Sequence, residues 1–361
     1  MISHEEIADF ARQAARESGF DLAGIAPVRE EDLPELQAFE EWIAAGHAGE
    51  MKYMERRTES GNLQRASARN AAPWARSVIV CALNYNTEQP YSTAVHDPQR
   101  GWISRYAWGT RDYHDALMPR LRQVETAVRT LAGKYDIQVE TRCYVDTGPL
   151  VERVYARHAG IGWMGKNTCL INQKLGSWVF LGMIVTSLEL APDLPASDRC
   201  GSCTRCIDAC PTEAIVGPGK LDARRCIAYL TIEKRGEIAE EFRSAIGHHV
   251  FGCDICQDVC PWNNKKGNAN PTSLPEFQPR ENLFHPILQW LAGMDEEAYR
   301  QNFSGSPVKR TKLPGLRRNV ALAMGNSGDR GFIPILEKLA ADSEPTVAEH
   351  AQWSLKRLRD S

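Results

Sequence analysis

Hydrophobic and polar residues alternate along the first half of the chain with the periods of helices and strands. Residues 4–18 carry apolar side chains at helical spacing, and Ser3 with Glu6 forms the capping-box pattern that begins a helix. Gly19 follows where the C-terminus of that helix is expected. The next apolar run, 20–26, is typical of a strand and is closed by a proline.

The same alternation continues to about residue 190. It predicts helices over 34–46, 112–135 and 149–159 and strands over 77–85, 137–145 and 177–187. Elements that alternate in this way indicate helices layered on a sheet, so we expect a mixed α/β (α+β) domain over 1–190. Proline and aspartate then interrupt the pattern in APDLPASD, residues 191–198.

Two further regions follow this domain. A cysteine-rich segment predicts a ferredoxin-like domain over 191–270, and a loop rich in proline and asparagine, 261–279, leads out of it. From about residue 312, alanine and leucine stand at close-packing helical positions, which is similar to a HEAT-type repeat of about one and a half units. We expect a linker and these helices over 271–361, and so short an array must pack on the rest of the chain.

Composition is that of an ordinary globular protein, because 43% of the 361 residues are hydrophobic and 25% are charged. No apolar run approaches the roughly 18 residues of a membrane-spanning helix, and the N-terminus lacks a secretory or twin-arginine signal. We therefore expect a cytoplasmic protein. Disulfides are disfavoured there, so eleven cysteines, eight of them within 200–260, point to a metal.

The eight clustered cysteines follow the spacing of bacterial ferredoxins. The run over 200–210 reads C-x2-C-x2-C-x3-C-P, in which three thiolates bind one [4Fe–4S] cluster and the fourth reaches a second cluster. A second run, over 253–260, lacks its first cysteine because Val250 stands there. Cys226 is the other cysteine nearby, so we expect it to take this place.

The exchange of the fourth ligand between two such runs gives each cluster four thiolates. The expected ligands are Cys200, Cys203, Cys206 and Cys260 for one cluster, and Cys210, Cys226, Cys253 and Cys256 for the other. Zinc and disulfides are the alternatives, but zinc favours two separated CxxC pairs and has no use for a third cysteine in a run. The apolar surroundings of Cys81, Cys143 and Cys169 favour packing.

About 190 residues precede the clusters, which favours an enzyme over a simple electron carrier. The segment 160–167, GIGWMGKN, has the spacing of a dinucleotide fingerprint, but a helical stretch precedes it where a strand is required, so we reject NAD binding there. Its glycines fit either a structural turn or a close approach to another cofactor. Asp146 follows a predicted strand and fits either a general acid or a helix N-cap, and spacing alone favours the cap.

The motifs around these residues resemble one family. The segments VDTGPLVERVYARHAGIGWMGKN, GSW, CGSCTRCIDACPTEAI, RCIAYLT and GCDICQDVCPWN together are similar to epoxyqueuosine reductases, which are related to cobalamin-dependent reductive dehalogenases. The resemblance covers nearly the whole chain. It implies reduction of epoxyqueuosine to queuosine at the wobble position of tRNA, the last step of queuosine synthesis. An external low-potential donor and the two clusters would reduce a base-off cobalamin to its nucleophilic cob(I)alamin state.

The resemblance also implies site residues. Asp146 matches the proton donor of the family, which reverses the preference for an N-cap. The positions expected around the cobalamin are Arg65, Ser104, Asp146, Arg153, Lys166, Leu170, Leu181 and Ala228. Ser104 stands where some members have cysteine. Asp112 and His114 begin the motif of proteins that supply histidine to cobalt, but Leu117 replaces the glycine of that motif, so we expect no histidine ligand.

Basic residues near the C-terminus predict a surface for tRNA. Residues 305–320 contain five cations and no acid, although the net charge of the chain is −3. A solvated basic face is the plain alternative, and the resemblance favours tRNA. The expected contacts are Lys234, Arg235, Lys265, Lys266, Lys309, Arg310, Arg317 and Arg318.

Two other functions fit part of the pattern. A reductive dehalogenase shares the cobalamin and the two clusters, but such enzymes commonly carry a twin-arginine signal and need no basic helical tail. A ferredoxin-type carrier fused to an interaction domain would bind no cobalamin, and its activity would not depend on Asp146. We expect instead a monomeric enzyme that acts on tRNA and has no membrane partner.

Overall fold

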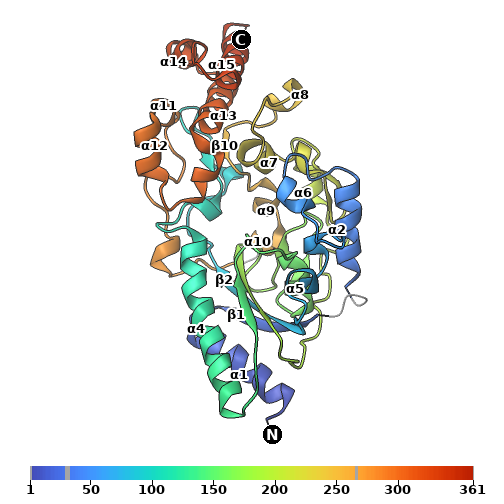
Figure 1. The fold of residues 1–361 in the computed structure, drawn as a ribbon. Coiled ribbons are helices and arrows are strands. Elements are labelled where there is room, and N and C mark those ends of the chain that lie inside the picture. Colours follow the sequence, from blue (N-terminus) through green and yellow to red (C-terminus); the bar gives the residue numbers. More distant parts are fainter. Residues whose placement is uncertain (1, 29–32, 265–266, 361) are drawn as a thin grey trace. The chain divides into compact units, whose positions relative to one another are not determined.

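The computed structural model describes residues 2–28, 33–264 and 267–360. The chain forms two compact units, each assembled from segments that alternate along the sequence (Figure 1). Unit 1 comprises Met1–Asn86, Tyr113–Cys203 and Pro261–Thr272, and unit 2 comprises Thr87–Asp112, Thr204–Cys260 and Ser273–Ser361. Long-range packing, rather than order along the chain, therefore defines the units.

Unit 1 is built on a four-stranded sheet with the order β1 (Leu22–Pro27), β2 (Ser77–Asn84), β7 (Val179–Thr186) and β4 (Thr141–Tyr144). Neighbouring strands are antiparallel throughout this sheet, so the expected mixed fold takes the α+β form. All eight residues of β2 are buried. This explains why the sequence of β2 is a nearly continuous apolar run instead of an alternating one.

Helices cover both faces of this sheet. α1 (His4–Glu17) and α4 (Tyr113–Lys134) pack together on one face, where Leu121 of α4 fills the space above Gly182 of β7. α5 (Glu152–His158) packs on the opposite face, where Tyr155 joins the buried cluster of Val78 and Val80. The other elements of unit 1 are α2 (Pro34–Ala44), α3 (Ala68–Ala71), β5 (Trp163–Met164), β6 (Leu170–Ile171) and α10 (Pro261–Asn264).

The elements predicted for unit 1 are present, most of them with shorter ends. Ser3 and Glu6 form the expected capping box at α1, and Gly19, at φ +87°, follows its end. The strand predicted over 137–145 is limited to β4. The helix predicted from residue 149 begins later, because a turn through Gly148 and Pro149 precedes α5.

Unit 2 contains little sheet. β3 (Trp102–Ile103) pairs in parallel with β10 (His249–Phe251), and β8 (Ile215–Gly217) forms a hairpin with β9 (Lys220–Leu221). The helices of its cysteine-rich part are α6 (Arg205–Asp208), α7 (Ile227–Ile232), α8 (Glu240–Arg243) and α9 (Ile255–Asp258). Those of its C-terminal part are α11 (Leu288–Ala292), α12 (Glu296–Phe303), α13 (Lys312–Asn326), α14 (Ile333–Leu339) and α15 (Pro345–Asp360).

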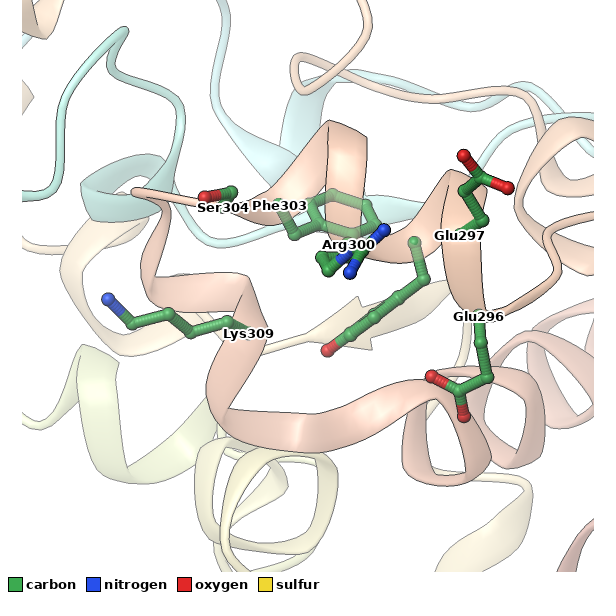
Figure 2. A pocket seen from close by; sticks show the side chains of 7 residues that line it. Glu296, Glu297, Arg300, Phe303, Ser304 and Lys309 are labelled. Carbon is green, nitrogen blue, oxygen red and sulfur yellow. The ribbon is translucent and has the colours of Figure 1, made fainter.

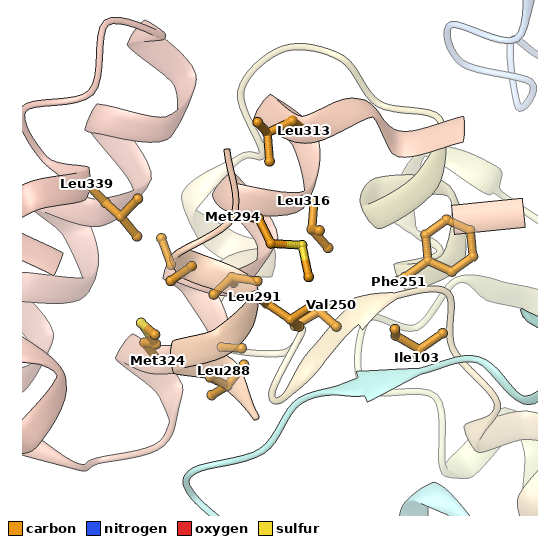
Figure 3. Close-up of a cluster of buried hydrophobic side chains, with 14 of the residues drawn as sticks. Ile103, Val250, Phe251, Leu288, Leu291, Met294, Leu313, Leu316, Met324 and Leu339 are labelled. Carbon is orange, nitrogen blue, oxygen red and sulfur yellow. The ribbon is translucent and has the colours of Figure 1, made fainter. Parts of the chain in front are cut away.

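α13 is the central helix of unit 2. It packs against α15, α11 and β10, and its side chains share one buried cluster with Val250 and Phe251 (Figure 3). Asn319 of α13 donates from Nδ2 to the carbonyl oxygens of Thr231 and Val250, at 2.8 and 2.9 Å. The C-terminal helices thus bury their apolar face against the segment that carries the cysteines. Their HEAT-type assignment stays a prediction.

Within the described ranges, no helix combines the length and the apolar character that a membrane crossing requires.

Candidate redox site and catalytic loop

The two cysteine runs fold into the same local structure. Residues 204–210 form α6 with its flanking turns, and residues 254–260 form α9 with equivalent turns. The backbone hydrogen bonds within 204–210 recur within 254–260 at an offset of 50 residues, with donors and acceptors in the same order. α6 and α9 are also neighbours. The sequence repeat is therefore a structural repeat over 204–210 and 254–260, whereas Val250 lies in β10 and Cys200 precedes a turn.

Three of the cysteines assigned to the second cluster lie near one another in unit 2. Burial raises the pKa of the Cys253 thiol well above its ordinary value, and the neighbouring thiols of Cys226 and Cys210 raise this pKa further. Cys226 stands at the start of α7. Val250 has no sulfur and is fully buried in the hydrophobic core, so the second run needs a thiolate from elsewhere, and the thiol of Cys226 lies near that of Cys253.

The cysteines assigned to the first cluster come from both units. Cys200 and Cys203 belong to unit 1, and Cys206 and Cys260 belong to unit 2. No disulfide joins any two of the eleven cysteines. Among the described side chains, no three His, Cys, Asp or Glu residues converge as ligands of a single metal ion. A cubane needs a wider set of thiolates, because each one binds a different iron.

The three cysteines that are assigned to neither cluster lie in unit 1. Cys81 and Cys143 are buried in the sheet of unit 1, and burial raises the pKa of the Cys143 thiol to about 12. Cys169 is half-buried.

A hairpin of unit 1 holds the loop that carries Cys200. The indole N–H of Trp163 donates to the Sγ of Cys200 at 3.5 Å. Lys166 Nζ donates to the carbonyl oxygens of Gly201 and Cys203, at 2.7 and 2.9 Å. Lys166, expected near the corrin, thus also anchors the cysteine loop.

The glycine-rich segment that supplies Trp163 and Lys166 is a tight hairpin after a helix. A Cβ on Gly162 would lie 2.4 Å from the carbonyl oxygen of Ile171, so a glycine is required for β5 and β6 to approach each other. The structural-turn alternative for the segment 160–167 thus has a physical basis. The helix α5 precedes this segment, whereas a dinucleotide fingerprint would need a strand there, so the expected helix is confirmed.

Unit 2 surrounds the second cysteine run with buried polar groups. Asp254 is 2% exposed and accepts the indole N–H of Trp102 at 3.0 Å and the backbone N–H of Arg105 at 2.8 Å. The hydroxyl of Ser104 also donates to Asp254. A Cβ on Gly252 would lie 2.5 Å from the Cβ of Ser104, so a glycine next to Cys253 permits this approach. Ser104, expected near the corrin, therefore uses its hydroxyl on the cysteine run.

Asp146 lies in a tight loop between β4 and α5. Its side chain is 57% exposed, and its Oδ2 lies 3.8 Å from the Nε2 of His114. The backbone of Asp146 is left-handed, at φ +55°, and the N–H of Thr147 donates to the carbonyl of Val145 at 2.5 Å. This conformation costs a non-glycine residue about 1 kcal/mol, so other contacts must hold the loop.

The N-cap alternative for Asp146 is wrong. α5 begins with Glu152, its N-cap position is Val151, and no side chain caps it there. The carboxyl of Asp146 is therefore available for chemistry. The imidazole of His114 near Asp146 belongs to a stack of rings in unit 1. Tyr113 stacks on His114 at 4.2 Å and on Phe180 at 4.7 Å between ring centroids.

Glu152 is a residue that the sequence reading missed. Its Oε1 accepts the backbone N–H of Asp146 at 2.7 Å. Burial, and then the charge of Asp146, raises the pKa of the Glu152 carboxyl to about 8. The sequence does show a glutamate six residues after Asp146, but their hydrogen bond depends on the turn between them, which the sequence pattern does not predict.

The remaining residues expected around a corrin are divided between the two units. In unit 1, Leu170 is 4% exposed and Leu181 packs on the same apolar cluster. Arg65 Nη1 donates to the carbonyl of Leu150 at 2.8 Å, and the guanidinium of Arg153 donates to Thr168. In unit 2, Ala228 packs on the hydrophobic core.

The residues expected to bind tRNA differ in exposure. Lys309 and Arg310 are exposed and pair with Asp112 at 3.1 Å and with Glu233 at 2.6 Å. Arg235 is exposed, and Lys234 is half-buried. Arg317 is 26% exposed and pairs with Asp342 at 3.0 Å. Lys265 and Lys266 lie outside the described residues.

Arg318 does not lie on the surface, so its place in the predicted basic patch is wrong. It is 1% exposed. Its guanidinium donates to the carbonyl oxygens of Leu230, Lys234 and Gly236 at 2.7 to 2.9 Å. These carbonyls at the end of α7 need donors, and Arg318 supplies them from α13.

A hollow of about 650 Å³ adjoins Lys309 in unit 2 (Figure 2). The residues that line it are Glu296, Glu297, Tyr299, Arg300, Phe303, Ser304 and Lys309. Its two carboxylates balance its two cations, and the rings of Tyr299 and Phe303 are buried. The charge of this hollow therefore favours neither an anion nor a cation.

Known proteins share this sequence over nearly its full length. Residues 65–147 match the family model described as "Epoxyqueuosine reductase QueG, DUF1730", and residues 199–263 match "4Fe-4S double cluster binding domain". An epoxyqueuosine reductase of Xanthomonas campestris pv. campestris is 39% identical over 95% of this chain and 94% of its own. One of Synechocystis sp. is 45% identical over 82% of this chain and 98% of its own.

The chain belongs to the epoxyqueuosine reductase family.

Solved structures of epoxyqueuosine reductases have the same fold. One with a tRNA-Tyr epoxyqueuosine-modified stem loop has a TM-score of 0.85 and 30% identity, over 99% of this chain and 91% of its own. One from Bacillus subtilis, with its catalytic aspartate loop swung out of the active site, has a TM-score of 0.84 and 29% identity, over 99% of this chain and 91% of its own. The resemblance read from the motifs is thereby confirmed. All eight expected cysteine ligands fall within the matched double-cluster segment.

Proposed function

We propose that this chain reduces epoxyqueuosine to queuosine in tRNA. The conversion removes the epoxide oxygen as water and leaves an alkene, so it consumes two electrons and two protons. The observation that carries the proposal is the full-length similarity to enzymes named epoxyqueuosine reductase, 39% over 95% of the chain in the relative from Xanthomonas campestris. The exposed Asp146 and the two cysteine runs supply the chemistry that such a reduction needs.

Asp146 is the proposed proton donor to the epoxide oxygen. Its carboxyl is exposed on a narrow loop, where a substrate can reach it, and the imidazole of His114 is 3.8 Å away. A carboxyl in hydrogen-bonding reach of the departing oxygen can act as a general acid. The relative from Bacillus subtilis is described with a catalytic aspartate loop, which supports this role.

An external low-potential donor supplies the electrons, which enter through two [4Fe–4S] clusters. The proposed ligands are Cys200, Cys203, Cys206 and Cys260 for the first cluster and Cys210, Cys226, Cys253 and Cys256 for the second. The repeated backbone of the two runs and the proximity of Cys226 to Cys253 support this assignment.

A cobalamin is the proposed acceptor of these electrons, and when bound it would supply a low-valent cobalt that acts as a strong nucleophile and reductant. The expected residues fit a corrin, because apolar Leu170 and Leu181 suit the ring and the cations Arg65, Arg153 and Lys166 suit its amide side chains. Arg65 keeps N–H donors beyond the one that it gives to Leu150. Ser104 and Ala228 complete the proposed set.

The tRNA contacts are proposed for the cations of unit 2 that reach solvent, which are Lys234, Arg235, Lys309, Arg310 and Arg317. The side chains of Lys309 and Arg310 are 58% and 42% exposed, so a phosphate can approach them from solvent while the largely buried carboxylates of Asp112 and Glu233 keep their pairs. Replacing both Lys309 and Arg310 with glutamate should weaken stem-loop binding about 10-fold and flatten its salt dependence. The same change at Lys356 and Arg359 is the charge-matched control.

The experiment that tests the function is anaerobic incubation of the holoprotein with a reductant and an epoxyqueuosine stem loop, followed by nucleoside mass spectrometry. Queuosine should form when both cobalamin and reductant are present, and omission of either should stop its formation. Intact epoxyqueuosine under full loading with cofactors would overturn the proposal.

A further inference from the structure

The Asp146 end of the loop in unit 1 is not held by burial of its own side chain. Asp146 is held at φ +55°, in a turn that the Thr147 N–H closes on the carbonyl of Val145. Its side chain is 57% exposed, so burial does not fix it. His114, at 3.8 Å, is too distant for a hydrogen bond to its carboxylate.

Glu152 holds this end of the loop from the first residue of α5. Its Oε1 accepts the backbone N–H of Asp146 at 2.7 Å, a short and well-formed hydrogen bond. The bond acts on the backbone of Asp146 and leaves the reactive carboxyl untouched. We infer that Glu152 is a positioning residue that latches the Asp146 loop in its working conformation, an inference that rests on the proposed role of Asp146.

Arg65 fastens the other end of the same loop. Its Nη1 donates to the carbonyl of Leu150 at 2.8 Å. Between the two ends, a Cβ on Gly148 would lie 2.6 Å from the ring of Tyr144, so the loop rests directly on that ring. The loop is thus held at Asp146 by Glu152, at Gly148 by packing and at Leu150 by Arg65.

The charges around Glu152 suit a latch that adds no charge to the site. Burial and the negative charge of Asp146 raise the pKa of Glu152 to about 8, while the N–H of Asp146 and the cations Arg65 and Arg153 oppose the rise. Near neutral pH the carboxyl is therefore mostly protonated. A neutral carboxyl can still accept the N–H through its carbonyl oxygen, and it does not repel Asp146.

The latch explains why a glutamate serves better than a packing residue. A loop that carries a proton donor must hold that donor within reach of the epoxide oxygen, and a displacement of about 1 Å can reduce a rate by about 100-fold. The hydrogen bond to Glu152 fixes the Asp146 end of the loop, and it can open without the unfolding of β4 or α5. Glu152 therefore controls the geometry of Asp146 rather than its chemistry.

The test compares Glu152→Ala, Glu152→Asp and Glu152→Gln in the holoprotein, with the exposed Glu140→Ala as control. Hydrogen exchange of the peptide over 143–150 should speed up about 10-fold in Glu152→Ala and less in Glu152→Asp, whose acceptor is drawn back by one carbon. Glu152→Gln keeps an oxygen acceptor of the same length, so it should exchange like the wild type, as should Glu140→Ala.

Turnover should follow exchange. With saturating stem loop, kcat should fall about 10- to 100-fold in Glu152→Ala while KM stays within about 2-fold, and Glu152→Gln should restore most of kcat. Wild-type exchange and kcat in Glu152→Ala would overturn the latch, and so would a Glu152→Gln variant as impaired as the alanine variant. If Glu152→Ala fails to fold, Glu152→Asp carries the same two measurements. If the wild type leaves epoxyqueuosine unchanged, the proposed function fails, while the exchange data still decide the latch.

Discussion

In the first cysteine run, Thr204 and Asp208 are exposed and bond to each other at 2.8 Å. At the equivalent places of the second run, Asp254 and Asp258 are each 2% exposed, and residues from the segment 87–112 surround them. The backbone hydrogen bonds within 204–210 and within 254–260 are nevertheless the same. The spacing of the cysteines thus determines the local fold, whereas distant parts of the chain determine the polarity around each run.

The largest expected difference between the runs concerns Cys226. The first run contains its own complete set of three closely spaced thiolates, whereas the second borrows Cys226. Cys226→Ala should therefore lower the iron content from about eight to about four per chain, because a cubane needs all four thiolates. Iron and sulfide analysis after anaerobic purification measures this loss. Cys169→Ala, the control, should keep about eight irons, and equal iron in both variants would argue against the proposed ligand set.

Asp254 should matter more for stability than its counterpart Thr204. Asp254→Ala leaves three buried donors without their acceptor and should lower the free energy of unfolding by about 3 kcal/mol. Thr204→Ala removes one exposed hydrogen bond and should cost less than about 1 kcal/mol. Urea unfolding of both holoproteins measures the difference. Equal losses would show that the buried network adds nothing to the second run.

Acid should lower the free energy of unfolding through His248, which precedes the second cysteine run in unit 2. His248 precedes β10, and burial, with His249, His285 and His96 nearby, lowers the pKa of its imidazole to about 3. The unfolded chain binds this proton near pH 6.5, so the stabilisation is complete above pH 6.5 and is lost as the pH falls towards 3. Between pH 7 and 5.5 the loss should be about 1 kcal/mol. His248→Gln should reduce the slope of stability against pH in urea unfolding by this amount, while the other buried histidines keep their own contributions, and the exposed His4→Gln should leave the slope unchanged.

The smallest effect is expected at the thiolates themselves. Cys200 receives a side-chain N–H from Trp163 at 3.5 Å, whereas Cys210 receives the backbone N–H of Ala214 at 3.3 Å. Trp163→Phe should make the potential of one cluster more negative by about 30 mV, because a hydrogen bond to sulfur favours the reduced state. Trp262→Phe is the control, because the ring of Trp262 contacts that of Trp163 edge-on at 5.0 Å between centroids. An unchanged redox titration in Trp163→Phe would remove Trp163 from the tuning of the cluster.

Features that depend on local spacing were predictable from the sequence. The capping box at Ser3, the buried strand β2 and the vacancy at Val250 all follow from residues close together in the chain. Features that depend on long-range packing were not. Asp254 finds the indole of Trp102 across 152 positions of sequence, and no local pattern announces this pairing.

Arg318 and Glu152 illustrate the same limit at the site. The sequence predicts Arg318 as part of a basic surface, because nothing in it shows that the guanidinium is buried and donates to carbonyl oxygens at the end of α7. Glu152 looked like an ordinary helix residue, because its hydrogen bond depends on the left-handed turn at Asp146. The assignment of residues to two interleaved units was equally invisible in the order of the elements.

A single-turnover assay on an epoxyqueuosine stem loop, with wild type and Asp146→Asn matched in iron and cobalamin content, examines the proposed reduction and its proton donor together. The wild type should form queuosine, and Asp146→Asn should form it about 100-fold more slowly, because an amide cannot supply the proton. Equal rates would exclude Asp146 as the donor, and a wild type that leaves the epoxide intact would exclude the reduction itself.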